Sequence, residues 1–229
     1  MNIGGLQKFS MIDYPNKLAA IVFTLGCNFR CGYCHNPELV LPEKFNPSLD
    51  EEKILEFFKT RVGKLDAISI TGGEPTMQKD LTQFMKKIKD LGFLIKLDTN
   101  GTDPKTLKEI IDNKLVDYIA MDIKAPFEKY EEVIKTKVDL EDIKKSIKMI
   151  MSSKIEYEFR TTIVKSQLSV KDLMGIGKLI KGANIYYLQK FVSSKANDDE
   201  FLKKKTYSDE EFEEIRKDIL KYVKNCKIR

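Results

Sequence analysis

Short apolar, β-branched segments alternate with longer segments of helical periodicity along most of this chain, and this alternation limits its fold more than any other feature. Six strands are predicted, with five helices between them. Such alternation implies a parallel sheet with right-handed crossovers. The predicted strands are 18–24, 66–71, 93–99, 117–123, 156–164 and 184–191, and the helices between them are 50–61, 79–91, 104–113, 139–152 and 169–181.

Six strand–helix units form either a doubly wound sheet or an incomplete barrel, because a complete eight-unit barrel needs about 250 residues. The chain has 229. We predict an α/β fold, a partial (β/α)6 TIM-like barrel, as a single domain over 1–229 with its core over about 18–191. A last helix is expected at about 208–225, and a polar surface loop at 193–205. Two capping boxes are predicted, Ser48 with Glu51 and Ser208 with Glu211.

The composition indicates a globular, cytoplasmic protein. Hydrophobic residues make up 42% of the chain, yet no segment approaches the ~20 apolar residues of a membrane helix, and the N-terminus lacks the pattern of a signal peptide. Forty Lys and Arg against 35 Asp and Glu leave a net charge of +5. We interpret the basic stretches as solvated helix faces and loops; the alternative is steering of an acidic partner protein or a nucleic acid, and a nucleic-acid partner is not expected.

The segment "TLGCNFRCGYCHNPEL" holds Cys27, Cys31, Cys34 and the only histidine, His35. In a reducing compartment, clustered cysteines are typical of metal or redox sites. Three thiolates do not complete a tetrahedral site, but they suit three irons of a [4Fe–4S] cluster and leave one iron open. The alternative is a zinc site with His35 as fourth ligand, which adjacent Cys34 and His35 would strain to form. Cys226 is interpreted as an unrelated thiol.

The other predicted strands also end in polar residues. Because ligands collect at the carboxyl ends of parallel strands, these residues predict one shared site. They are Gly72, Gly73 and Glu74 in "TGGEP", Asp98, Thr99 and Asn100 in "DTNG", Asp122 and Lys124 in "MDIK", Arg160 within the fifth strand and Gln189 in the sixth.

"CNFRCGYC" followed by "GGEP" resembles the radical S-adenosylmethionine (SAM) superfamily. The longer segment "SMIDYPNKLAAIVFTLGCNFRCGYCHNPEL" is similar to the glycyl-radical-enzyme activating proteins, and most to the activating protein of anaerobic ribonucleoside-triphosphate reductase. The resemblance extends from about Gly4 to Gln189. It implies that the three cysteines hold the [4Fe–4S] cluster, while SAM chelates the remaining iron through its amino and carboxylate groups.

The resemblance also assigns roles to single residues. It implies that Tyr33 contacts the adenine, that the glycine motif meets the methionine end of SAM, and that Lys124 suits its carboxylate. Asp98, Thr99 and Asn100 would form a polar rim near SAM that can also hold a monovalent cation. Asp122 would contact SAM, Arg160 would pair with a carboxylate of SAM or of the rim, and Gln189 would contact the ribose. His35 would donate to the cluster or SAM, and Asp13 would contact the partner's glycine loop. Ordinary turns, salt bridges and a structural hydrogen bond of His35 remain the alternatives.

The implied activity is oxygen-sensitive reductive cleavage of SAM, whose 5′-deoxyadenosyl radical removes hydrogen from a glycine Cα of a partner enzyme. The expected partners are a glycyl radical enzyme, anaerobic ribonucleotide reductase first among them, and a ferredoxin or flavodoxin as electron donor. Residues 35–71 contain no cysteine, so no second cluster is expected. Two alternatives remain: a radical SAM enzyme acting on a small molecule or RNA, similar to 7-carboxy-7-deazaguanine synthase, and a zinc-stabilised binding module.

Overall fold

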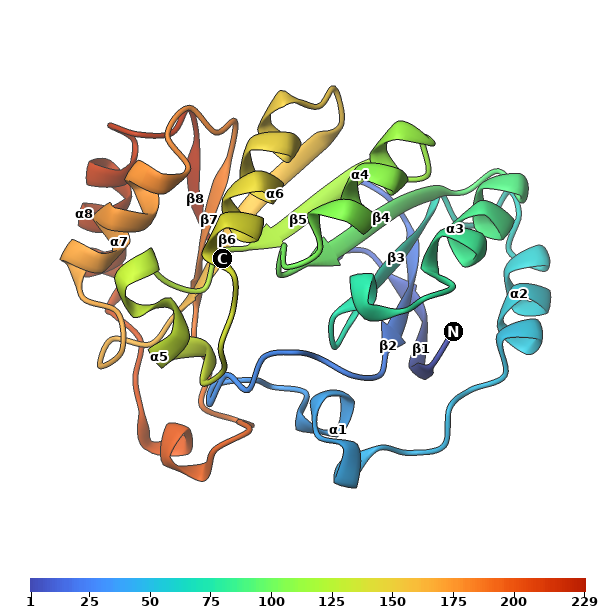
Figure 1. Cartoon of the computed structure of the whole chain (residues 1–229), viewed down its shortest axis with the longest axis horizontal. Coiled ribbons are helices and arrows are strands. Elements are labelled where there is room, and N and C mark those ends of the chain that lie inside the picture. The colour runs from blue at the N-terminus through green and yellow to red at the C-terminus, as the bar shows by residue number, and fades with distance from the viewer.

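The computed structural model describes all 229 residues, and one curved sheet of eight strands runs through it (Figure 1). Neighbouring strands follow in chain order; β1 is antiparallel to β2, and every other pair is parallel. Unbroken sequential order belongs to a barrel, whereas a doubly wound sheet reverses its order at a switch point. Because β1 and β8 do not pair, the barrel is open on one side, which confirms the predicted partial barrel. The strands are β1 Ile3–Ser10, β2 Ala19–Thr24, β3 Ala67–Gly72, β4 Leu94–Thr99, β5 Tyr118–Asp122, β6 Glu156–Ile163, β7 Tyr186–Lys190 and β8 Cys226–Ile228.

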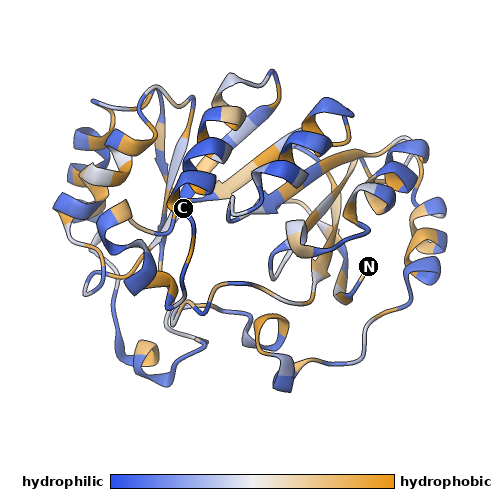
Figure 2. Cartoon of the chain, viewed as in Figure 1, coloured by the Kyte–Doolittle hydropathy of each residue, from blue (hydrophilic) through white to orange (hydrophobic).

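Most helices cover the outer side of this sheet, with apolar faces inward and charged faces outward (Figures 1 and 2). In α3 the residues Leu81, Phe84, Met85 and Ile88 are buried, at the spacing of one helical face. No helix has both the length and the apolar character needed to cross a membrane. The helices are α1 Pro37–Val40, α2 Glu51–Lys59, α3 Leu81–Asp90, α4 Pro104–Asp112, α5 Tyr130–Ile134, α6 Leu140–Ser152, α7 Val170–Leu179 and α8 Asp209–Ile219, with short 3-10 turns at Pro42–Lys44, Pro75–Met77, Phe127–Lys129 and Asp199–Lys203.

The register of the parallel strands brings their polar ends to one edge. Thr24 pairs with Gly72 across β2 and β3, and Asp122 pairs with Arg160 across β5 and β6. The sequence predicted these elements because each strand is an apolar run that stops at a polar turn. The site residues therefore come from different strands but meet at the same rim.

Four expectations about elements are corrected. The last helix ends at Ile219 rather than near 225, while Ser208 and Glu211 do form its capping box. Ser48 does not cap α2, because its hydroxyl accepts from the Ile3 amide at 2.9 Å; Asp50 is the cap instead. The sheet also extends beyond 18–191, since β1 and β8 add an edge strand on each side. Segment 193–205 lies mostly at the surface, as predicted, but it is not wholly a loop, because it includes a 3-10 turn and the buried Phe201.

Candidate active site

A cavity of about 320 Å³ lies at the carboxyl edge of the strands, beneath the segment 25–40, which we call the cysteine loop. Every residue that the sequence predicted for the cluster and SAM site lines this cavity, whereas Asp13, predicted for the partner's glycine loop, does not. The predicted residues that line it are Cys27, Cys31, Tyr33, Cys34, His35, Gly72, Gly73, Glu74, Asp98, Thr99, Asn100, Asp122, Lys124, Arg160 and Gln189. The lining residues outside the predicted set are Phe29, Asn36, Val40, Thr71 and Thr162. Thr162 could have been found, because it faces the same side of its strand as Arg160, two residues away.

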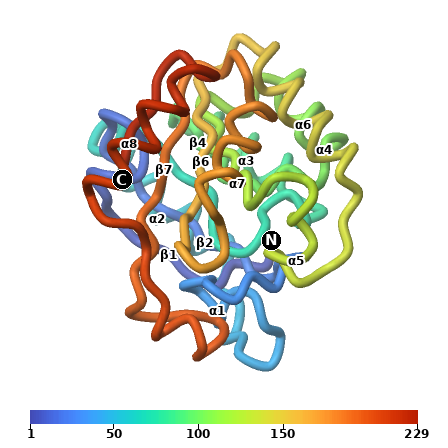
Figure 3. The backbone as a smooth tube through the Cα atoms, turned by 90° about the vertical axis from the view of Figure 1, so that its left-hand side faces the viewer, coloured from blue at the N-terminus to red at the C-terminus, as the bar shows by residue number.

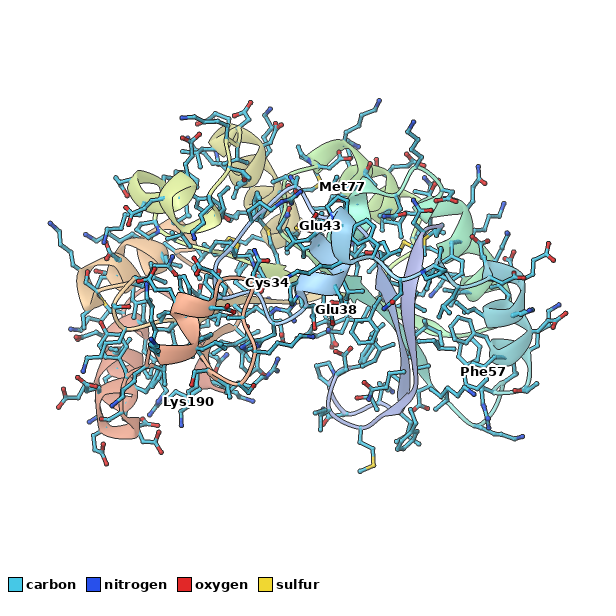
Figure 4. The ribbon with its side chains drawn as sticks, turned by 90° about the horizontal axis from the view of Figure 1, so that it is seen from below. Cys34, Glu38, Glu43, Phe57, Met77 and Lys190 are labelled. Atoms are coloured by element: carbon cyan, nitrogen blue, oxygen red, sulfur yellow. The ribbon has the colours of Figure 1, made fainter.

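Backbone contacts hold the cysteine loop in place. The Arg30 side chain donates to the carbonyls of Cys27 and Phe29, at 2.6 and 2.8 Å, and its amide donates to the Ile134 carbonyl at 2.8 Å. Figure 4, which views the molecule from below, shows Cys34 near the middle of the picture, close to Glu38 of α1. The loop thus presents its thiols to the cavity from a fixed frame.

None of the three cysteines is in a disulfide, and their surroundings disfavour the free thiolate. Burial, with a smaller effect from the nearby Glu74 carboxylate, raises the pKa of the Cys27 thiol to about 12. Burial likewise raises the pKa of Cys31 to about 11 and that of Cys34 above its ordinary value. A catalytic cysteine needs a lowered pKa, whereas a metal deprotonates its ligands on binding. These cysteines are therefore suited to ligation and not to nucleophilic attack.

The geometry does not suit a single metal ion. No group of three or more His, Cys, Asp or Glu side chains is arranged around one ion position. Sulfurs on one zinc lie only about 4 Å apart, because each Zn–S bond is about 2.3 Å, while a cluster spreads its ligands over several irons. His35 is also engaged elsewhere, since its Nε2 donates to the Val192 carbonyl at 2.7 Å and its ring stacks on Phe191. A Cys3His zinc site is thus not supported.

Residues 191–205, which we call the strap, pack against the outside of the cysteine loop. In Figure 3 this orange-red segment lies beside α1 at the bottom of the molecule. The Asp198 amide donates to the Gly32 carbonyl at 3.0 Å, and a Cβ at Gly32 would lie 2.3 Å from the Phe201 ring. Lys195 pairs with Glu38 at 2.7 Å. The strap therefore shields the thiols from solvent on this side.

The turn 72–74, which we call the glycine turn, fits closely against the cysteine loop. The Glu74 amide donates to the Gly26 carbonyl at 2.8 Å. A Cβ at Gly73 would lie 1.9 Å from that same oxygen, and one at Gly72, whose φ is +112°, would lie 2.4 Å from the Thr24 amide nitrogen. Both glycines are therefore required for backbone packing, a reason that is separate from the predicted approach to SAM.

Glu74 is buried and surrounded by neutral donors. Its carboxylate accepts from Thr76 (2.6 Å to the hydroxyl), from the Thr99 hydroxyl (2.8 Å) and from the Asn100 amide (2.7 Å). Burial raises the pKa of Glu74, and these hydrogen bonds offset the effect only in part. Glu74 thereby joins the end of β3 to the end of β4.

Charged side chains on β4, β5 and β6, with Asp13 from the β1–β2 loop and Lys124 just after β5, form a line of alternating sign, which we call the ion chain. Its distances are 3.3 Å from Asp13 to Lys96, 2.5 Å from Lys96 to Asp98, 2.8 Å from Asp98 to Arg160, 2.7 Å from Arg160 to Asp122 and 3.1 Å from Asp122 to Lys124. Burial alone would raise the pKa of Asp98, but Arg160 and Lys96 hold it well below its usual range. Burial opposes the charge on Lys124, yet Asp122 raises the pKa of that ammonium well above its ordinary value.

Lys96 was not predicted as a site residue. It interrupts an apolar strand and shares a face with Asp98, and this alternation was the available signal. The structure also places Asp13 against this lysine, at the opposite end of the ion chain from Lys124.

One buried polar atom in the cavity lacks a protein partner. The Tyr33 ring is buried beside Phe201, and its hydroxyl makes no hydrogen bond within the chain. Buried hydroxyls are normally paired. The candidate partner is the Cys31 thiol, where the Tyr33 hydroxyl lowers the pKa against the larger effect of burial, so this hydroxyl lies next to a predicted cluster ligand. With three thiols and the ion chain on the same cavity, the donor set fits both an iron–sulfur cluster and a ligand that carries opposite charges.

Comparison with known proteins agrees with this geometry. The Radical SAM superfamily model matches residues 21–167. The chain is 38% identical to a "putative glycyl-radical enzyme activating enzyme" of Methanocaldococcus jannaschii, over 99% of this chain and 95% of that protein. It is 28% identical to the 7-carboxy-7-deazaguanine synthase of Thermococcus kodakarensis (69% and 68% covered) and 28% identical to the pyruvate formate-lyase-activating enzyme of Clostridium pasteurianum (78% and 77% covered).

Among solved structures, Streptococcus suis SuiB bound to S-adenosylmethionine shares the fold. The TM-score is 0.69 at 15% identity, over 90% of this chain and 48% of SuiB. This likeness concerns the fold, a partial barrel built on the same sheet.

The chain belongs to the radical SAM superfamily, whose members use a [4Fe–4S] cluster and SAM. Within it, the chain is an enzyme of the class that activates glycyl radical enzymes. The predicted family, enzyme class and cofactors are thereby confirmed. The roles of the single site residues stay predictions, now with a geometry that can be tested.

Proposed function

We propose that this enzyme generates a glycyl radical on anaerobic ribonucleoside-triphosphate reductase, in the cytoplasm, with a ferredoxin or flavodoxin as electron donor. The observation that carries the proposal is the cavity itself, which places three cluster-type cysteines opposite an ion chain at the open rim of the barrel. The motif "SMIDYP…CHN" supports the choice of partner. The net charge of +5 is consistent with an acidic donor protein.

Cys27, Cys31 and Cys34 would hold the cluster, and the cavity below them would take SAM. When bound, these groups supply one-electron cleavage of the sulfonium to methionine and a 5′-deoxyadenosyl radical, which removes a hydrogen atom from the glycine Cα. The chain's own task is to hold the reacting groups and to exclude water. The strap and the buried Tyr33 ring would do the latter on the side of the cysteine loop.

Arg160 and Lys124 would bind the carboxylate of SAM. Arg160 uses Nε and Nη2 for Asp122 and Asp98, which leaves Nη1 for a ligand. Lys124 contacts only one carboxylate through its ammonium group and also lines the cavity. A guanidinium and an ammonium at one rim make a strong site for a carboxylate. The carboxylates of Asp122 and Asp98 would face the ammonium group of SAM, with Glu74 behind them.

The test is a reaction of the anaerobically reconstituted enzyme with SAM, reductant and an anaerobic ribonucleotide reductase. We expect an EPR doublet from a glycyl radical on the reductase, and none when Cys34→Ala replaces the wild type. A doublet on another glycyl radical enzyme only would correct the partner. No doublet on any such protein would overturn the activase function.

A second candidate function is modification of a small molecule, favoured by the similarity to 7-carboxy-7-deazaguanine synthase. Both functions use the same cavity, so SAM cleavage alone does not separate them. Formation of a 7-carboxy-7-deazaguanine product, without any protein radical, would favour this second function.

A further inference from the structure

Lys96 is a buried cation that no role described so far requires. Its side chain is only 2% exposed, and it lies outside the residues that line the cavity. Burying a lysine is costly unless it is paired. Its ammonium group contacts Asp98 at 2.5 Å and Asp13 at 3.3 Å. It therefore stands behind Asp98, on the side away from Arg160.

Each inner member of the ion chain lies between two groups of opposite charge. Asp98 gives Oδ1 to Lys96 and Oδ2 to Arg160, so its two oxygens serve different cations. Arg160 in turn divides its donors between Asp98 and Asp122. This division holds the guanidinium across two strands and leaves Nη1 without a carboxylate partner, on a side chain that lines the cavity.

Without the ammonium of Lys96, Asp98 would have one cation instead of two. A guanidinium binds a carboxylate best with two parallel hydrogen bonds to both oxygens. Arg160 would then turn toward Asp98 and away from Asp122. The unpartnered Nη1 would turn with it and would no longer be held by the two aspartates.

We propose that Lys96 is a positioning residue for the SAM carboxylate, acting through Asp98 and Arg160 without touching the ligand. This inference deepens the proposed function only in assuming that SAM occupies the cavity, and it does not depend on which partner is activated. The role is specific: Lys96 affects one group of the ligand, the carboxylate, and not its adenosine part.

The test compares two ligands on the anaerobically reconstituted enzyme, SAM and 5′-methylthioadenosine, which lacks the amino-acid group. In Lys96→Met we expect the Kd for SAM to rise about tenfold, the loss of one charge-assisted hydrogen bond. The Kd for 5′-methylthioadenosine should stay within about twofold, and the iron content should equal that of the wild type. Lys96→Arg, which keeps the charge, should bind SAM more tightly than Lys96→Met.

The matched control is Lys89→Met. Lys89 also pairs with an aspartate, Asp117 at 2.8 Å, but it lies away from the cavity, so both affinities should remain unchanged. If Lys96→Met does not fold, Lys96→Gln tests the same point, because its amide can still donate to Asp98 without carrying charge. An unchanged affinity for SAM, an equal loss for both ligands, or a fall in iron content would overturn the proposal. None of these results involves the partner enzyme, so the proposed activase function is judged separately.

Discussion

Two buried carboxylates face the same cavity, and their surroundings are opposite. Glu74, in the glycine turn, accepts hydrogen bonds from neutral hydroxyls and amides, and burial raises its pKa. Asp98, in the ion chain, lies between two cations, and its pKa is lowered. One half of the site is thus held by close backbone packing, and the other half by alternating charge. We therefore expect added side-chain atoms to disrupt the glycine turn and the removal of a charge to disrupt the ion chain.

The largest effect is expected from a substitution that removes one of the three predicted cluster ligands. Cys34→Ala should lose nearly all of its iron and all SAM cleavage, because two thiolates do not retain the cluster. Iron analysis after anaerobic reconstitution measures this. Cys226→Ala is the matched control, since that buried thiol on β8 does not line the cavity, and it should keep its iron. Equal iron loss in both variants would contradict the assignment.

In the ion chain, Arg160→Met should lower the free energy of unfolding by about 1.5–3 kcal/mol, because Asp98 and Asp122 lose their shared cation and keep only one cation each. Urea unfolding of the metal-free protein measures this loss. Arg160→Lys keeps the charge but not the forked geometry, so its free energy of unfolding should lie between those of the wild type and Arg160→Met. A loss below about 1 kcal/mol for Arg160→Met would show that charge does not hold this half together.

In the glycine turn, Gly73→Ala should destabilise the protein by about 1–3 kcal/mol, because the new methyl group overlaps the Gly26 carbonyl. The iron content should fall with it, since the same carbonyl belongs to the cysteine loop. Gly5→Ala is the control; a Cβ there meets only ordinary contacts, the nearest at 3.5 Å. If the two variants were equally stable, the close packing of this turn would be refuted.

The two carboxylates should respond oppositely to pH. The lowered pKa of Asp98 means that its contribution is fully present above its unfolded value of about 3.9 and is lost as the pH falls further. The raised pKa of Glu74 means that stability is lost as the pH rises above its unfolded value of about 4.3. Unfolding between pH 3 and 7 should therefore show Asp98→Asn approaching the wild type toward low pH, and Glu74→Gln gaining on it toward high pH. For each variant, the stability difference from the wild type can be plotted against pH. If these two plots sloped in the same direction, the contrast between Asp98 and Glu74 would be contradicted.

The smallest effect is expected outside both halves. Lys195→Ala removes an exposed ion pair between the strap and Glu38, which should cost at most about 0.5 kcal/mol. Chemical unfolding and the rate of cluster loss in air measure it. We expect the cluster to be lost at nearly the wild-type rate. A clearly faster loss would mean that this ion pair, and not Phe201, holds the strap against the cysteine loop.

The sequence predicted the half of the site that depends on strand order. Asp98, Asp122, Arg160 and Gln189 follow or interrupt apolar strands, and parallel order brings such residues to one rim. The edge strands were missed because β1 buries only Ile3 and Ser10 and has two glycines after Ile3, and because β8 has only three residues. Neither shows the buried apolar run by which the other strands were found.

Contacts between distant segments were the second limit. Ser48 was predicted to be a helix cap, but its hydroxyl instead accepts a hydrogen bond from the Ile3 amide, 45 residues away. Phe201 lies in a polar segment, and only the structure shows that it packs on Gly32. Of the ion chain, the sequence predicted Asp98, Asp122, Lys124 and Arg160 as site residues, but neither Lys96 nor the order of the pairs, because the order depends on which side chains meet inside the barrel.

The most direct test of the central claim is anaerobic reconstitution followed by incubation with SAM and dithionite. We predict about four irons per chain, held by Cys27, Cys31 and Cys34, and formation of methionine and 5′-deoxyadenosine. One tightly bound zinc per chain, with SAM left intact, would contradict the account.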